Sequence, residues 1–293
     1  MKIIDCFMFF DEKMMLDIRL NILDQHVTHF IICEATYNHK GEAKPLNFNI
    51  NDYAKFKNKI TYIVLDKQPK NLRKIKEGDS INEKNSKILD NAVLRENYQR
   101  NYLATQLNGF SDNDLILIND LDEIPNLENF KYKNKISIFK QKMFYYKLNL
   151  SQPNFIWYGS KICKKKHLKN PQWLRNIKSR KYPLWRLDAF FSKKKYFDID
   201  LIDDGGWHFT NMKSVEKIEH KMKSFLHHLE YEKSGLKKDD LKKMIYEKKI
   251  IYNHNIDQKG YKWSDTTKLE NINKNFLPKY IIKNINKFKE WLD

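Results

Sequence analysis

Hydrophobic positions along the first part of the chain predict strands that alternate with helices. The apolar runs at residues 3–10, 30–33 and 60–65 have the length and composition of buried strands. Between the first two, apolar residues recur every three or four positions through residues 15–23, which predicts an amphipathic helix. This order of strand, helix and strand is typical of a parallel sheet with right-handed crossovers.

The alternation continues into the middle of the chain. Residues 67–85 are polar and rich in Lys, which predicts an exposed loop. A long helix is expected after it, with Ser86 as its N-cap and Gly109 as the residue at which it stops. The run at residues 114–118 then predicts a buried strand that leads into a group of acidic residues.

The second half of the chain has a different pattern. Residues 136–148 and 154–158 predict longer strands, and the chain from residue 214 onward is helical and rich in Lys. The expected fold class is therefore α/β, with a Rossmann-type, mostly parallel sheet flanked by helices and a helical, Lys-rich C-terminal extension. We place the main domain at residues 1–228 and the extension at residues 229–293.

Composition allows a large core and narrows the range of partners. Of the 293 residues, 41% are hydrophobic and 14% aromatic, which is too apolar for a disordered chain. With 55 Lys and Arg against 37 Asp and Glu, the formal net charge is +18. Such a charge suits nucleotides, phosphates, nucleic acid or acidic lipid surfaces, although heavy use of Lys, Asn and Ile is also expected of an A+T-rich genome.

The three cysteines, Cys6, Cys33 and Cys163, favour a reducing compartment. Their odd number and wide spacing argue against a disulfide framework or a cysteine zinc site, and the first two lie in apolar runs. No segment reaches the roughly 18 apolar residues of a membrane span, and residues 1–10 lack the features of a signal peptide. A cytoplasmic location is expected.

Two aspartates, Asp120 and Asp122, follow the strand at residues 114–118. Strand side chains two residues apart point the same way, so two carboxylates would face one side at the carboxyl end of a buried strand, where open α/β sheets bind ligands. Like charges this close repel unless a cation neutralises them, and oxygen ligands suit Mg²⁺ or Mn²⁺. An Asp-x-Asp pattern also occurs by chance, so its position is what favours a metal site.

A second candidate segment is Asp203-Asp204-Gly205-Gly206-Trp207-His208-Phe209. Paired glycines allow the backbone to approach a ligand closely. Asp204 is a candidate general base, and His208 a candidate ligand or acid–base group. The alternative is a tight turn that leads into a strand with buried Trp207 and Phe209.

Two of the chain's few arginines, Arg95 and Arg100, lie in one short stretch of the long predicted helix. Arg suits bidentate contacts with phosphate or carboxylate groups, which favours a role at an anionic ligand. The alternative is a solvated helix face on which Glu96 pairs with Arg100.

In chain order, these segments resemble glycosyltransferase family 17, the family of β-1,4-mannosyl-glycoprotein β-1,4-N-acetylglucosaminyltransferases. The matching stretches are Asp5 to Glu12 with Ile18-Arg19-Leu20, Glu34-Ala35-Thr36, Lys44-Pro45-Leu46, Arg95 to Arg100, Asp120 to Pro125, Asp204 to Phe209, and Lys221 with Ser224, Phe225 and His227. The resemblance covers residues 5–227 and fades after that point.

The resemblance implies a GT-A fold, a nucleotide-sugar donor and a divalent metal. The expected reaction is the transfer of GlcNAc or a related hexose to a glycan hydroxyl, with inversion. Its transition state has oxocarbenium character, and negative charge grows on the leaving diphosphate. A UDP-sugar is the expected donor, and Mn²⁺ or Mg²⁺ the expected cofactor, held by Asp120 and Asp122 with His208.

The other expected site residues fall into two groups. Donor contacts are expected from side chains at strand ends and on the long helix: Glu34, Thr36, Arg95, Arg100 and Asp120. The base that takes the proton of the acceptor hydroxyl is expected to be Asp204, with Glu123 as the second candidate.

Two other functions share some of these features. A metal-dependent nucleic-acid enzyme would also use paired carboxylates, but it predicts a continuous basic, aromatic groove, for which only residues 161–195 are a candidate. We expect no specific nucleic-acid partner. A non-catalytic glycan-binding module would not need Asp120 and Asp122. The basic C-terminal helices suit either contact with an anionic membrane or a solvated helix face.

Overall fold

The computed structural model describes residues 1–224, 228–253 and 267–293. Phe225 and His227, two residues of the family resemblance, lie outside these ranges.

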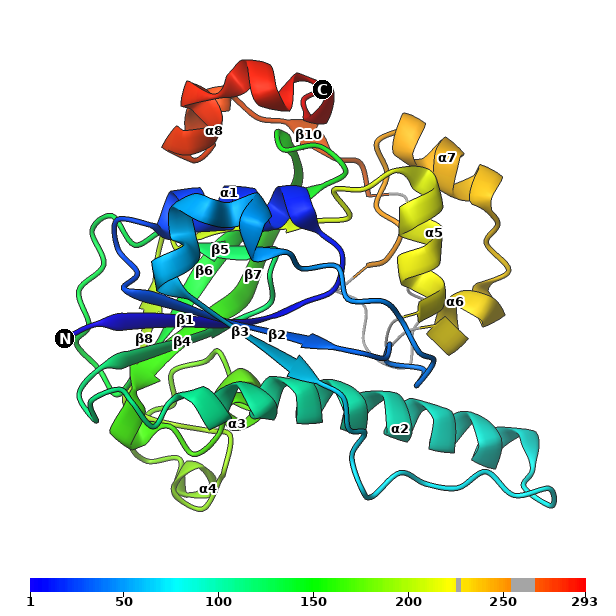
Figure 1. Ribbon diagram of the computed structural model, residues 1–293, viewed down its shortest axis with the longest axis horizontal. Coiled ribbons are helices and arrows are strands. Elements are labelled where there is room, and N and C mark those ends of the chain that lie inside the picture. The colour runs from blue at the N-terminus through cyan, green and yellow to red at the C-terminus, as the bar shows by residue number, and fades with distance from the viewer. Residues whose placement is uncertain (225–227, 254–266) are drawn as a thin grey trace.

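The first half of the chain builds the parallel part of the sheet. Its elements are β1 (Ile3–Phe9), α1 (Lys13–Leu23), β2 (His29–Ala35), η1 (Ile50–Lys59), β3 (Ile60–Leu65), α2 (Ile81–Tyr102), η2 (Leu103–Gln106) and β4 (Leu115–Asn119). The strands β3, β2, β1 and β4 lie side by side in that order, and all of them run parallel (Figure 1). The predicted alternation of strands and helices is confirmed in this half.

The next elements turn the sheet into a mixed one. They are β5 (Glu123–Pro125), β6 (Ile136–Tyr145), β7 (Leu150–Lys164), η3 (Lys165–His167), α3 (Pro171–Asn176), α4 (Leu187–Phe190), β8 (Ile199–Ile202) and β9 (Gly206–Thr210). β7 runs antiparallel to both β4 and β6, and β9 runs parallel to β6 but antiparallel to β5. The prediction of a mostly parallel sheet is corrected accordingly. The reason is the short connection between β6 and β7, which permits only a hairpin.

The remaining elements are α5 (Val215–Ser224), α6 (His228–Ser234), α7 (Lys238–Tyr246), β10 (Glu270–Asn271), η4 (Lys274–Phe276), α8 (Lys279–Lys283) and η5 (Ile285–Trp291). The last of them pack on α1, where Leu277, Ile281 and Phe288 are buried in the same apolar cluster as Leu16 and Leu20. The end of the chain therefore contributes to the core. In the ranges given above, no helix has both the length and the apolar character that crossing a bilayer requires.

Alternate residues of the parallel strands enter two different cores. Phe7 and Leu117 belong to the cluster that includes α1 and α8, whereas Cys6 and Ile118 belong to the cluster that includes η2 and α3. Figure 1 shows α1 above the sheet and α2 below it. Because helices cover both faces, the polar groups of this sheet reach solvent mainly at the strand ends.

The long helix begins and ends earlier than predicted. α2 starts at Ile81 because Ser80 caps it: the Ser80 hydroxyl accepts from the Glu83 amide at 3.3 Å, and the Glu83 carboxylate accepts from the Ser80 amide at 2.8 Å. The predicted N-cap, Ser86, lies inside the helix, and the chain tightens into η2 well before the predicted stop at Gly109.

Candidate active site

The turn between β4 and β5 carries both predicted metal-binding aspartates. Asp120 and Asp122 follow β4 directly, and the Glu123 amide closes the turn by donating to the Asp120 carbonyl at 3.1 Å. The antiparallel register of β5 and β9 then places Glu123 opposite His208. Residues 120–123 therefore meet the strand that follows Asp204, and His208 of that strand, across one strand pair.

A buried ion pair beneath this turn fixes its backbone. Arg19 of α1 and Asp5 of β1 are both fully buried, and the guanidinium donates to the Asp5 carboxylate at 2.8 and 2.7 Å. The same guanidinium donates to the carbonyl oxygens of Asp120, Leu121 and Glu123, at 3.3, 3.2 and 2.7 Å. Because a bidentate pair has a defined geometry, it holds the turn in one conformation.

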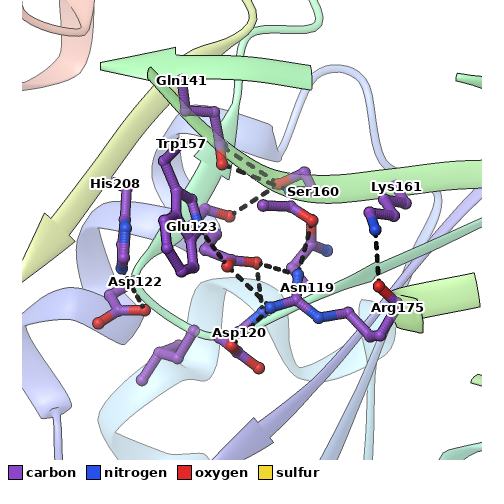
Figure 2. A network of polar contacts seen from close by, with 12 residues as sticks. Asn119, Asp120, Asp122, Glu123, Gln141, Trp157, Ser160, Lys161, Arg175 and His208 are labelled. Atoms are coloured by element: carbon purple, nitrogen blue, oxygen red, sulfur yellow. Dashed lines mark hydrogen bonds and ion pairs between the residues drawn. The ribbon is translucent and has the colours of Figure 1, made fainter. Parts of the chain in front are cut away.

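Two arginines neutralise the charge of Asp120. Arg100 donates to its Oδ1 at 3.0 Å. Arg175 donates to its Oδ2 at 2.9 Å and to the Glu123 carboxylate at 2.7 Å (Figure 2). Burial alone would raise the pKa of Asp120, but the charges of Arg175 and Arg100 outweigh it and hold the pKa below its usual value. Glu123 is completely buried and also accepts from Trp157 Nε1, at 2.6 Å.

Asp122 has a different environment. Its Oδ1 lies 3.4 Å from His208 Nε2, and its Oδ2 lies 3.8 Å from Lys221 Nζ. Figure 2 shows Asp122 and His208 facing each other on the side of the turn away from Arg175. Burial alone would raise the pKa of Asp122, but His208 and Lys221 hold it below its usual value.

A cavity of about 310 Å³ opens beside Asp122. Its wall comes from the carboxyl ends of β1 and β2, from α2, β9 and α5, and it includes Tyr37, Glu96, Asp120, Asp122, His208 and Lys221. This volume lies at the lower end of the roughly 300–1,000 Å³ that small-molecule sites occupy. Because its wall includes the carboxyl ends of β1 and β2, the cavity lies where an α/β sheet is expected to bind its ligand.

Three residues that were predicted to contact the donor instead hold the chain that forms the cavity wall. Glu34 is fully buried and accepts from Lys44 Nζ at 2.6 Å, and the Thr36 amide donates to the end of β3 at 3.0 Å. Arg95 donates to the His39 carbonyl at 3.1 Å. Lys44 and His39 both line the cavity, so Glu34 and Arg95 position residues of its wall without lining it themselves. Their direct contact with a donor stays a prediction.

The turn before β9 lies apart from this cavity. Asp204 lines a separate groove beside Trp207 and Phe276. Gly206 has a φ of +119°, and a Cβ there would lie 2.2 Å from the Ile124 carbonyl oxygen. The glycine therefore permits close approach of the protein's own backbone, which favours the tight-turn alternative for this segment. Only the strand that follows the turn reaches the cavity, through His208 and Thr210.

Three residues that build the site were not predicted to do so from the sequence: Arg175, Trp157 and, as the residue that holds the turn, Arg19. Arginine is scarce in this chain, and Arg175 and Arg180 lie as close together as Arg95 and Arg100 do, so the same pattern could have indicated Arg175. Trp157 lies 34 residues from Glu123 in the chain and reaches it through its indole, so no local pattern in the sequence could have indicated the contact.

The fit of a divalent metal rests on Asp122 and His208. Within the described residues, no three His, Cys, Asp or Glu side chains gather as a complete metal site. Asp122 and His208 offer one oxygen and one nitrogen 3.4 Å apart in the cavity wall. Mg²⁺ usually takes one or two protein carboxylates and completes its shell with water and substrate phosphates, so a small donor set of this kind fits a metal that binds with a phosphorylated ligand. In contrast, both oxygens of Asp120 accept from arginines.

A helix-covered α/β sheet with a charged cavity at its strand ends is typical of enzymes that bind nucleotide-like ligands. The model of glycosyltransferase family 17 matches residues 1–293, and the chain belongs to this family. It is therefore a glycosyltransferase, with a nucleotide-sugar donor and a glycan acceptor. The match includes residues 229–293, where the sequence motifs had not indicated a resemblance to the family. A search of curated proteins found no match.

Proposed function

We propose that this glycosyltransferase moves GlcNAc or a related hexose from a UDP-sugar to a glycan hydroxyl, with inversion and with the help of Mn²⁺ or Mg²⁺. The observation that carries the proposal is the pair of Asp122 and His208 in the wall of the cavity. A GT-A type of fold belongs to the same proposal, and the parallel strands β3, β2, β1 and β4 support it.

The cavity suits a donor with a diphosphate. Lys44 and Lys221 bring positive charge to its wall, and Tyr37 and Phe10 offer aromatic faces for a base or a sugar. Asp122 and His208 would hold the metal, which, when bound, offsets the negative charge that grows on the leaving diphosphate. Asp120 remains a predicted ligand; in this structure it lies in the cavity wall and pairs with Arg100 and Arg175.

The proton of the acceptor hydroxyl needs a base inside the cavity. In the transfer, the acceptor oxygen bonds to C1 of the sugar, the bond from C1 to the phosphate oxygen breaks, and the hydroxyl proton passes to a carboxylate. Glu12 lines the cavity and pairs with Lys213 at 3.0 Å. Glu96 lines it too, but Arg100, at 2.7 Å, outweighs the effect of burial and holds the pKa of Glu96 below its usual value, which makes Glu96 a weaker base. We therefore take Glu12 as the first candidate base and compare with it the two bases predicted from the sequence, Asp204 and Glu123, neither of which lines the cavity.

A donor assay tests this function. The purified protein is incubated with UDP-GlcNAc, UDP-glucose or UDP-galactose and a glycan acceptor, with Mn²⁺ or with EDTA, and released UDP is measured. We expect acceptor-dependent release that EDTA abolishes. Glu12→Gln should keep donor binding and lose transfer. The matched control, Glu96→Gln, should keep both. Transfer that proceeds equally well in EDTA would contradict the metal, and a Glu12→Gln variant with normal turnover would contradict the base.

The expected cytoplasmic location stays a prediction. The three cysteines are free and buried, which fits a compartment that keeps thiols reduced.

A further inference from the structure

One exposed segment carries large apolar side chains that the proposed reaction does not use. The segment spans residues 178–195 and includes α4. Between residues 184 and 191 lie five exposed apolar side chains: Leu184 at 74%, Trp185 at 76%, Leu187 at 71%, Phe190 at 60% and Phe191 at 91%. Single apolar residues are common on protein surfaces, but a group of this size marks an interaction surface.

The base of the segment is fixed, and its tip projects from the fold. The Lys178 amide donates to the Lys194 carbonyl at 2.8 Å, which ties the two ends together. Trp173 Nε1 donates to the Lys193 carbonyl at 3.1 Å and so anchors the same end to α3. Figure 1 shows α4 far from α5, a helix that lines the cavity. Contacts of the tip therefore leave the cavity open.

Positive charge surrounds the apolar tip. The segment holds seven Lys or Arg residues and one acidic residue, Asp188. Arg186 and Lys195 both pair with Asp188, so its charge is already balanced within the segment. Lys181, Lys193 and Lys194 are exposed beside the tip.

We propose that residues 178–195 dock the enzyme on an anionic lipid surface. The apolar tip would enter the boundary between headgroups and acyl chains, and the lysines would lie at the lipid phosphates. Apolar burial and attraction to anionic lipid together give stable interfacial binding where either alone is weak. Exposed leucines beside the aromatic rings favour lipid over nucleic acid, since bases stack on aromatic rings but not on leucine.

This assignment moves the expected membrane contact away from the C-terminal helices. Those helices bury Leu277, Ile281 and Phe288 against the core. Their exposed large apolar side chains, Tyr246, Phe276 and Ile282, lie apart along the chain and do not form a run like that of residues 184–191. The proposal does not depend on which sugar is transferred. A failure of the docking test would leave the proposed function intact, and the reverse also holds.

Vesicle co-sedimentation tests the docking with the full chain. The vesicles are phosphatidylcholine alone, or phosphatidylcholine mixed with phosphatidylglycerol. The tip variant is Leu184→Ser with Trp185→Ser and Phe191→Ser, and the charge variant is Lys193→Gln with Lys194→Gln. The matched control is Lys74→Gln, Ile75→Ser and Lys76→Gln, which removes an exposed apolar residue between two lysines in another loop. Thermal unfolding checks that each variant folds.

We expect the wild-type protein to bind the phosphatidylglycerol vesicles and not those of phosphatidylcholine alone. The tip variant should weaken binding by at least about tenfold. The charge variant should weaken it by about 30-fold, and salt should weaken it further. The control should bind as the wild type does, and transfer to a water-soluble acceptor should be unchanged in all variants.

Three results would overturn the proposal: no vesicle binding by the wild type, vesicle binding that the tip variant leaves unchanged, or an equal loss of binding in the control. If the wild type does not bind vesicles, we would measure polynucleotide binding and self-association by light scattering. Loss of either in the tip variant would show that the segment serves that partner and not a lipid surface.

Discussion

The two acidic segments of this chain, residues 120–123 and 203–204, resemble each other in sequence and differ in surroundings. The first follows a buried strand, and its carboxylates meet Arg100, Arg175 and His208. The second lies in an exposed turn before a strand, where Asp203 pairs with Lys140 at the surface. Acidic composition alone therefore does not make a site. The first segment forms one because it ends a buried strand and its carboxylates meet Arg100, Arg175 and His208.

The largest effect is expected from removing the clamp of the first segment. Arg19→Met leaves Asp5 buried without its partner and releases three carbonyl oxygens of the turn. We expect a loss of about 3–5 kcal/mol in the free energy of unfolding, measured by urea denaturation. Arg73→Met removes an exposed pair with Asp90 and should change stability by less than about 1 kcal/mol. Equal effects of the two substitutions would show that the clamp does not stabilise the fold.

Catalysis separates the two segments next. Asp122→Asn should lower kcat/KM for sugar transfer by about 10²–10³-fold, because it removes a charge from the proposed metal pair while keeping the side chain's shape. Asp204→Asn should change kcat/KM by less than about twofold, because Asp204 lines a separate groove. A large loss in Asp204→Asn with normal turnover in Asp122→Asn would reverse the assignment of the two segments.

A substitution at Gly206, which follows the second segment, tests whether this turn has a structural role. Gly206→Ala forces a side chain into a left-handed conformation and against the Ile124 carbonyl, so we expect a loss of about 2–3 kcal/mol in stability. Gly109→Ala is the matched control, because a Cβ there meets no atom within 4 Å. If Gly206→Ala were as stable as the control but failed to bind donor, the glycine would serve the ligand and not the fold.

The smallest change is expected in how the free energy of unfolding depends on pH, through Lys161, which holds the backbone of Arg175. Lys161 is buried and donates to the carbonyl oxygens of Arg175 and Ile177, both at 2.6 Å, and burial lowers its pKa to about 7 from 10.5. Between those values the unfolded chain holds a proton that the folded chain has lost. Stability therefore rises with pH through this window.

We expect the wild type to gain about 1–2 kcal/mol between pH 7 and pH 9 relative to Lys161→Met, measured by urea denaturation. Lys166→Met, at an exposed position nearby, should follow the wild type. The same pH slope in the wild type and Lys161→Met would remove Lys161 as the titrating group.

Local patterns in the sequence predicted the parallel strands and the position of Asp122, because both depend on one apolar run and its end. They did not predict the antiparallel position of β7, which depends on pairing between distant strands. Nor did they predict that Glu123 meets Trp157 and Arg175, because these side-chain contacts join distant segments. The start of α2 was within reach of the sequence, because Ser80 and Glu83 form a recognisable capping box.

Calorimetric titration of UDP tests whether Asp122 holds a metal that binds together with the donor. UDP is titrated into the wild type, Asp122→Asn and Asp204→Asn, each with and without Mn²⁺. We expect Mn²⁺ to tighten UDP binding about 5- to 150-fold in the wild type and in Asp204→Asn, and to have no effect in Asp122→Asn. An undiminished effect of Mn²⁺ in Asp122→Asn would show that Asp122 does not hold the metal.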